Sequence, residues 1–128
     1  MAEASYSTLS ARERAGAILD PGSFQPLADV AADIPFAIGY GTLDGRAVVV
    51  ALSDGHQRGG TFGVAEADVL DAVLESALPE GADPAAAPGV ILGFDTGGVR
   101  VEEGPVALAA VSAVAVALAQ LVARGLRV

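Results

Sequence analysis

A short apolar strand, a glycine pair and a long apolar helix follow one another between residues 90 and 123, and this succession constrains the fold most. Val90–Phe94 has the composition of a strand, Gly97-Gly98 interrupts the apolar pattern, and Pro105–Ala123 contains no charged residue. An apolar helix next to a strand is typical of a parallel β-α-β crossover, in which the helix covers a sheet. The sequence therefore predicts an α/β domain.

A β-hairpin is predicted upstream. Ile38–Leu43 and Arg46–Leu52 flank Asp44-Gly45, a strong two-residue turn signal because both turn positions take a positive φ. Ala47–Leu52 is apolar without alternation, which predicts a strand covered on both faces. Leu126-Arg127-Val128 are predicted to begin one more strand.

Two more helices are expected before the apolar one. Ser10-Ala11-Arg12-Glu13 matches a capping box and predicts a short helix that ends at Asp20-Pro21-Gly22. A second, amphipathic helix is predicted after Gly63. Its expected buried stripe is Val69, Leu70, Val73, Leu74, Ala77 and Leu78, and its expected water-facing residues are Glu66, Asp68, Asp71 and Glu75.

Composition excludes several classes of function. The 128 residues suit one domain, and a hydrophobic fraction of 52% is ample for a core. A net charge of −9 argues against a nucleic-acid partner, and the absence of cysteine excludes disulfides and cysteine-bound zinc; no metal site is predicted. No signal peptide is expected in the first twenty residues, which predicts a cytoplasmic location. The run 105–123 is slightly short for a membrane span, so a buried core helix is preferred and no membrane partner is predicted.

Two glycine loops are the candidate sites. Gly59-Gly60-Thr61-Phe62-Gly63 lacks the lysine of a nucleotide P-loop, and is either a tight turn or a place where backbone approaches a thioester. Thr96-Gly97-Gly98-Val99-Arg100 is either a structural turn or an anion site, because amides at a helix start can hold an oxyanion.

Charged residues near the second loop have alternative interpretations. Arg100 either pairs with Glu102 or Glu103 or binds a substrate carboxylate. Glu102 and Glu103 suit the positive end of the following helix without a catalytic role. His56, the only histidine, is interpreted as a solvated loop residue.

Several short stretches occur in a characteristic order: Leu9–Arg14 with Leu19–Phe24, Gly41–Arg46, Gly59–Gly63 and Thr96–Glu103. Together they resemble the carboxyltransferase branch of the crotonase-like superfamily, and within it the β subunits of biotin-independent malonate decarboxylases. The cysteines that bind zinc in bacterial acetyl-CoA carboxylase β subunits have no counterpart here, which favours the decarboxylase branch.

The resemblance implies a partial crotonase-like (ClpP/crotonase) ββα spiral. Residues 1–128 would form the N-terminal half of a carboxyltransferase-like domain, with a helical arm over 1–24 and a core over 36–128. The implied reaction is decarboxylation of malonyl-S-acyl-carrier protein to acetyl-S-acyl-carrier protein and CO₂, a carboxy-lyase reaction through an enolate. The implied backbone donors to the enolate oxygen are Gly97, Gly98 and Val99, and the implied thioester-binding residues are Gly59, Gly60, Thr61, Gly63 and Arg100.

The resemblance also implies partners and departures. The chain itself would bind no cofactor; a CoA-derived prosthetic arm on an acyl-carrier partner would bear the thioester, and a homologous γ-type subunit would complete the enzyme. Thr61 stands where the family often has serine, and Asp95 where this branch often has glutamate. The family's second oxyanion amide lies in a glycine-rich turn after the strand that Leu126-Arg127-Val128 begins, so the isolated chain is expected to be inactive. The alternative is a non-catalytic structural or regulatory subunit of an acyl-CoA carboxylase or decarboxylase complex.

Overall fold

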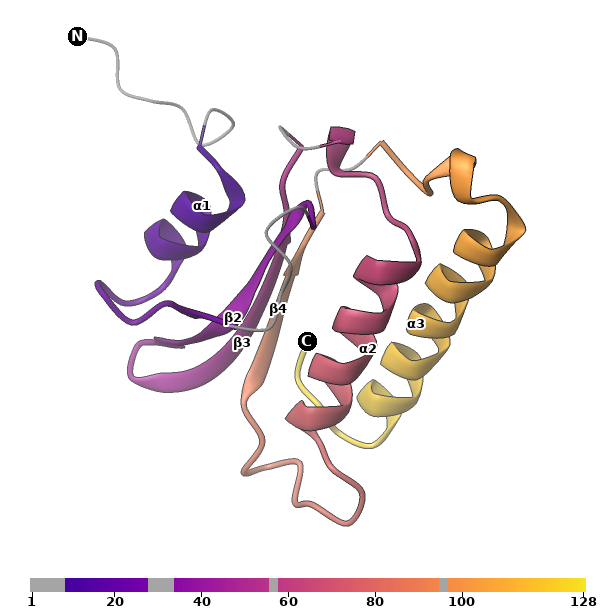
Figure 1. Ribbon diagram of the computed structural model, residues 1–128. Helices are drawn as coiled ribbons and strands as arrows, with labels where there is room; N and C mark the ends of the chain where they lie inside the picture. Colours follow the sequence, from indigo (N-terminus) through magenta and orange to yellow (C-terminus); the bar gives the residue numbers. More distant parts are fainter. Residues whose placement is uncertain (1–8, 28–33, 56–57, 95–96) are drawn as a thin grey trace, which may run out of the picture.

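The chain folds into a four-stranded sheet with helices on both faces (Figure 1). This computed structural model describes residues 9–27, 34–55, 58–94 and 97–128. Helix α1 (Ala11–Ile18) lies on one face, and α2 (Val64–Ala77) and α3 (Pro105–Ala123) lie on the other. The strands are β1 (Gln25–Pro26), β2 (Phe36–Leu43), β3 (Arg46–Ser53) and β4 (Gly89–Gly93), in that spatial order. The predicted α/β class is confirmed.

The hairpin forms at the predicted turn. β2 and β3 pair antiparallel with Leu43 opposite Arg46, and Asp44 and Gly45 have φ values of 50° and 78°. Asp20 closes this turn from α1's side, because its carboxylate accepts the backbone N–H groups of Asp44 and Gly45, each at 2.9 Å. The turn therefore depends on a carboxylate that precedes it by more than twenty residues.

β3 is covered on both faces, as its unbroken apolar run predicts. Val48, Val50 and Leu52 pack with α1, whereas Val49 and Ala51 belong to the core cluster beneath α2. This alternation places α1 and α2 on opposite faces of one strand.

The predicted capping box of α1 is present. Ser10 Oγ accepts the Glu13 N–H at 3.1 Å, and Glu13 Oε1 accepts the Ser10 N–H at 3.2 Å. The helix is also fixed to the end of β3, since Arg14 Nη2 donates to the Ser53 carbonyl at 2.9 Å. The helix thus covers the sheet rather than projecting from it.

β3, α2 and β4 form a parallel crossover, with Val50 opposite Ile91. The sequence predicted such a crossover for the apolar helix that follows β4. The predicted buried stripe of α2 is confirmed except that Val69 is only half-buried. Glu66 was expected to face water, and this prediction is wrong: the side chain is 1% exposed. It lies in the first turn of α2, where it forms an ion pair with Arg100 from a distant loop.

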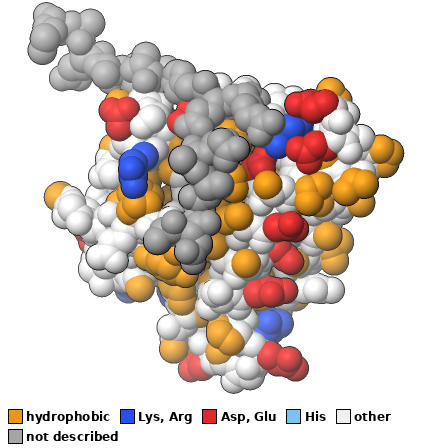
Figure 2. Space-filling model, in the orientation of Figure 1, with side chains coloured by type: hydrophobic (Ala, Val, Ile, Leu, Met, Phe, Trp, Pro, Cys, Tyr) orange, Lys and Arg blue, Asp and Glu red, His pale blue; other side chains and the backbone are white. Residues whose placement is uncertain are grey.

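The predicted bounds of α3 agree with the structure, but its predicted burial does not. α3 packs alongside α2 through Ala110, Val111, Val114 and Leu118, while only Ala107 and Leu121 are fully buried. Its outer side exposes apolar side chains, and Figure 2 shows them gathered on the flank that α3 forms. The largest of these are Val106, Leu108, Val116 and Val122.

By length and composition, α3 is also the one helix among the described residues that could cross a membrane, a test that core helices of soluble proteins pass as well. The absence of charged residues suggested a core helix. In the structure, α3 instead packs on one side and exposes apolar side chains on the other, which we call its bare side.

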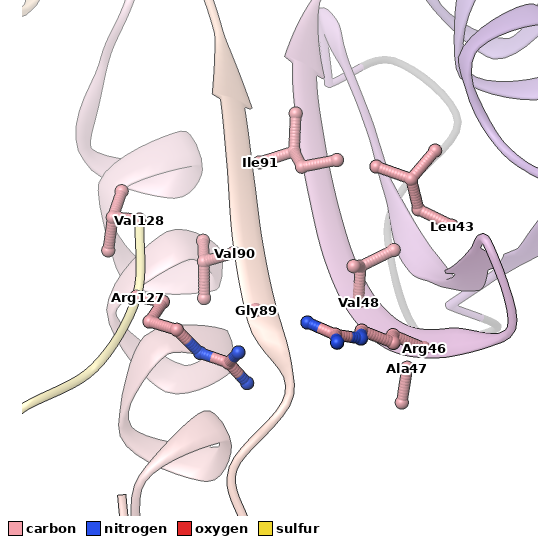
Figure 3. Close-up of a pocket in the computed structure, with 9 residues that line it drawn as sticks. All are labelled: Leu43, Arg46, Ala47, Val48, Gly89, Val90, Ile91, Arg127 and Val128. Carbon is pink, nitrogen blue, oxygen red and sulfur yellow. The ribbon is translucent and has the colours of Figure 1, made fainter. Parts of the chain in front are cut away.

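The last residues of the chain lie along the outer edge of β4 (Figure 1). The Arg127 carbonyl accepts the Val90 N–H at 2.9 Å, and Leu126 is buried in the core cluster. Residues 126–128 do not form a regular strand, but this bond pairs the segment in which the sequence predicts a further strand with β4 (Figure 3).

Candidate functional site

The two glycine loops lie together beyond the carboxyl ends of the parallel strands β3 and β4. The first loop contains η2 (Arg58–Gly60) and leads into α2; the second leads into η3 (Val101–Glu103). Ligands of open α/β sheets commonly bind at the carboxyl ends of parallel strands, where successive loops converge. The sheet therefore brings together the two segments that the sequence singled out.

The second loop does not begin a helix directly, which corrects the expectation of an anion site at the start of α3. Val99 forms a parallel bridge with Phe62, the turn η3 follows, and Gly104 with φ 72° precedes Pro105. The glycine pair therefore lies in a non-helical segment, held by the first loop rather than by a helix.

Three backbone hydrogen bonds join the loops. The Gly97 N–H donates to the Gly59 carbonyl, the Phe62 N–H to the Gly98 carbonyl, and the Arg100 N–H to the Phe62 carbonyl, each at 2.8 Å. Gly59 and Gly60 have φ values of 64° and 65°, and Gly98 has 104°, so glycine is suited to all three positions. The two loops form one small backbone ladder.

This ladder determines which predicted donors can face a ligand. The Gly97 amide is engaged by Gly59 and is not available in this conformation. Since the Gly98 carbonyl and the Arg100 amide are turned toward Phe62, the Val99 N–H points to the opposite side of the segment. Among the three predicted donors, Val99 is the one whose amide the ladder directs outward.

Arg100 connects the second loop, to which it belongs, with Thr61 in the first loop and Glu66 in α2. Burial disfavours its charge, but hydrogen bonds to Glu103 and Glu66 outweigh that effect and raise its pKa above the ordinary value. Its guanidinium bonds to the Glu66 carboxylate, to Glu103 Oε2 at 2.7 Å and to the Thr61 carbonyl at 2.9 Å. A further bond reaches Thr61 Oγ1 at 3.2 Å. We call Arg100, Thr61, Glu66 and Glu103 the Arg100 cluster.

The interpretation of Arg100 as the partner of Glu103 is confirmed, and its side chain is 3% exposed. It is a buried tie between loops in this structure, not an open fork for a substrate carboxylate. Sequence reasoning missed Glu66, although a glutamate in the first turn of a helix after a glycine loop is a usual position for an acidic partner.

Glu103 completes the cluster at the amino terminus of α2. Its Oε1 accepts the Val64 N–H at 2.9 Å, so this carboxylate occupies the positive end of α2 rather than of α3 as expected. Gly63 leaves the room that this approach requires, because a Cβ there would overlap the Glu103 carboxylate and lie 2.7 Å from Arg100 Nη1. Gly59, Thr61 and Gly63 thus support the second loop, and their contact with a thioester, like that of Gly60, stays a prediction.

Three phenylalanines lie beside the loops and were not singled out from the sequence. The ring centroids of Phe36 and Phe62 are 5.0 Å apart, and Phe94 lies 6.1 Å from each. Phe94 is 54% exposed, directly after β4. The chain has only four phenylalanines, so three in one place form an apolar wall next to the glycine ladder. Their scarcity was the signal that could have identified them.

Other predicted features fall outside the described residues. His56, Asp95 and Thr96 are among them. Within the described ranges, no group of three His, Asp or Glu side chains could hold a metal ion.

The sequence and the fold are similar to those of known proteins. The chain is similar to a Pseudomonas malonate decarboxylase MdcD-MdcE hetero-dimer, with 33% identity, a TM-score of 0.78, and coverage of 91% of this chain and 49% of the other. It is also similar to a Pseudomonas malonate decarboxylase hetero-tetramer in complex with malonate, with 30% identity, a TM-score of 0.80, and coverage of 92% of this chain and 48% of the other. The chain therefore spans about half the length of these relatives, and the predicted crotonase-like fold is confirmed.

An acyl-CoA carboxylase chain and a transcarboxylase are similar as well. The propionyl-CoA carboxylase β chain of Saccharopolyspora erythraea is 33% identical over 114 residues, an alignment that covers 77% of this chain and 20% of the relative. The transcarboxylase 12S structure with methylmalonyl-coenzyme A and methylmalonic acid bound has a TM-score of 0.68 at 29% identity, over 84% of this chain and 22% of the other. Residues 3–125 match the family model of the carboxyl transferase domain, and the chain belongs to that family.

Proposed function

We propose that this chain is a β-type subunit of a malonate decarboxylase, which removes CO₂ from a malonyl thioester carried by an acyl-carrier protein. The similarity to two malonate decarboxylase structures over more than nine tenths of the chain supports this choice within the family. The thioester would be borne on a CoA-derived arm of the carrier, and a γ-type partner would assemble with this chain.

The observation that carries the proposal is the direction of the Val99 amide, away from the first loop, in a ladder of three backbone hydrogen bonds. When the C–C bond of the malonyl group breaks, its electron pair moves to the thioester and places negative charge on the carbonyl oxygen. CO₂ leaves, and the enolate takes a proton from water to give the acetyl thioester. An amide fixed before the reaction stabilises that oxygen without reorganisation.

The bare side of α3 supports assembly with another subunit. Exposed, contiguous apolar surface on a soluble protein marks an interaction site, and α3 carries no charged residue to interrupt it. The Pseudomonas relatives are a hetero-dimer and a hetero-tetramer. We therefore propose the outer side of α3 as a contact with the partner subunit.

The test replaces the Val99 amide by an ester, through the hydroxy-acid analogue of valine, in the complex reconstituted with its partner and carrier. The change removes one N–H and keeps the side chain. Release of CO₂ from the malonyl carrier should fall by about 10²–10³. The same replacement at Val101, which is 86% exposed in η3, is the matched control and should have little effect.

A second candidate is a non-catalytic structural subunit of a decarboxylase or acyl-CoA carboxylase complex. The Gly97 amide favours it, because one of the three predicted donors is already satisfied within the fold. In that case, the complex would assemble and turn over equally with the Val99 amide and with the ester. Equal rates would therefore reject the catalytic role and leave the structural one.

A further inference from the structure

The Val99 amide takes its direction from the peptide group that it shares with the Gly98 carbonyl. In a planar trans peptide, the C=O and the N–H point in opposite directions. The Phe62 N–H donates to the Gly98 carbonyl at 2.8 Å, so the Val99 N–H points away from the first loop. The next bond of the ladder joins the Arg100 N–H to the Phe62 carbonyl, also at 2.8 Å. The direction of the amide therefore depends on the register of Gly98 and Arg100 against Phe62.

The residues before Val99 contribute little to holding this register. Gly97 and Gly98 have no side chains, and Gly98 has a φ of 104°. Glycine has more backbone freedom than any other residue, so a glycine pair does not fix its own conformation. From Gly97 onward, Arg100 is the first fully buried residue of the segment. The fixed point of the second loop is therefore the residue next to Val99.

Arg100 holds the first loop with its side chain as well as with its backbone. Its Nη2 donates to the Thr61 carbonyl at 2.9 Å, and its Nε donates to the Thr61 hydroxyl oxygen at 3.2 Å. Thr61 directly precedes Phe62 in the chain. The side chain and the main chain of Arg100 thus bond to adjacent residues, and a shift of the register would break both sets of bonds.

Two carboxylates fix the Arg100 guanidinium in turn. Glu66, in the first turn of α2, accepts a bond from Nη2, and Glu103 Oε2 accepts one from Nη1 at 2.7 Å. The Glu66 side chain is 1% exposed, against 30% for Glu103, so Glu66 offers no surface to a ligand. A buried ion pair adds little net stability, but its charged hydrogen bonds are strong and directional. These properties suit a role in geometry.

We propose that the Arg100 cluster positions the Val99 amide for decarboxylation, and that Glu66 is its remote positioning residue. Glu66 holds Arg100, and Arg100 holds the register that directs the amide toward the enolate oxygen. This inference rests on the proposed function, in which the Val99 N–H meets that oxygen. The amide contributes most when charge develops on the oxygen, so Glu66 should affect kcat and leave KM unchanged.

Glu66→Gln in the reconstituted complex tests this role. The carboxamide has the shape of the carboxylate and keeps an acceptor oxygen, but it lacks the charge that holds the guanidinium. We expect kcat for release of CO₂ from the malonyl carrier to fall by a factor of about 10 to 10², as for a small misplacement of a catalytic group. Glu75→Gln, on the exposed side of α2, is the matched control and should have the kcat of wild type. An unchanged kcat in Glu66→Gln, or a loss that lies entirely in KM, overturns the proposal.

Combining Glu66→Gln with the ester at Val99 separates positioning from a general effect on the fold. If Glu66 acts through the Val99 amide, its substitution has no further effect once that amide is absent, and the double variant is about as slow as the ester alone. If the two losses multiply, Glu66 serves the fold only, which overturns the positioning role and leaves the proposed function in place. An ester complex with the wild-type rate rejects the proposed function, and this inference with it.

Glu103→Gln provides the same test if the Glu66 variant does not fold. Glu103 bonds to the same guanidinium, and its greater exposure makes the substitution milder for the fold. A fall in kcat that disappears in the Val99 ester background supports positioning by the Arg100 cluster. A fall that persists unchanged in that background overturns it.

Discussion

The guanidinium of Arg100 and the carboxylate of Glu66 form a buried ion pair between residues 34 positions apart in the chain. The pair joins the loop before η3 to the first turn of α2, and neither side chain is more than 3% exposed. A buried pair of this kind stabilises little by itself, since desolvation offsets attraction, but the loss of one partner leaves an uncompensated charge.

We therefore expect Arg100→Met to lower the free energy of unfolding by about 3 kcal/mol, because the Glu66 carboxyl group would stay buried without its partner. The measurement is urea unfolding of the full chain, with exposed Arg12→Met as the control. Adding Glu66→Met to the first variant should recover part of the loss. If the two changes are simply additive, Arg100 and Glu66 are not coupled and the Arg100 cluster does not act as a unit.

Asp20 is expected to make stability depend on pH in acid. The Gly45 N–H, then the Thr42 hydroxyl and the Asp44 N–H, lower the pKa of this carboxyl below its ordinary value. A lowered pKa in the folded state stabilises the fold above about pH 4, and this contribution disappears as the pH falls through the folded pKa.

Asp20→Asn should therefore destabilise the chain at pH 6 and have progressively less effect toward pH 2. Thermal unfolding across this range checks the prediction, with exposed Asp68→Asn as a control for a general change of charge. A constant difference between wild type and Asp20→Asn at all pH values would show that the carboxylate charge is not what closes the turn.

The bare side of α3 gives a prediction about assembly. Val116 is 57% exposed there, and Val116→Glu should prevent association with the partner subunit while leaving the chain's own unfolding unchanged. Size-exclusion chromatography with light scattering measures the complex. Ser76→Glu, on the exposed side of α2, adds the same charge away from α3 and should not affect assembly. Normal assembly of the Val116 variant would remove α3 from the proposed interface.

Local signals in the sequence were sufficient for the hairpin, the capping box and the bounds of α3. Asp44-Gly45 determines its turn through backbone conformation, and Ser10 with Glu13 determines its cap within one helical turn. Burial was harder to predict, because it depends on what lies beside a residue in space. Glu66 is buried only because Arg100 reaches it from another loop, and α3 is exposed because no described element covers it.

The same distinction applies to the site. The glycine spacing identified both loops, since positive φ at Gly59, Gly60 and Gly98 is a local requirement. That Gly97 donates to Gly59, and that Val99 is thereby directed outward, follows from the register between two segments separated by a whole crossover. A single sequence contains no local signal for that register.

Gly63 is the position where the Arg100 cluster should be most sensitive to a single methyl group. A Cβ there would overlap the Glu103 carboxylate and approach Arg100 Nη1 to 2.7 Å, so both partners would have to move. Gly63→Ala should destabilise the chain by about 1–3 kcal/mol, the usual cost of overpacking. Gly16→Ala is the matched control, because a Cβ at this helical glycine of α1 meets nothing within 4 Å and should stabilise by about 0.5–1 kcal/mol. Urea unfolding of both variants gives the comparison, and opposite signs are expected. If Gly63→Ala is as stable as wild type, Glu103 does not need its close approach to the amino terminus of α2.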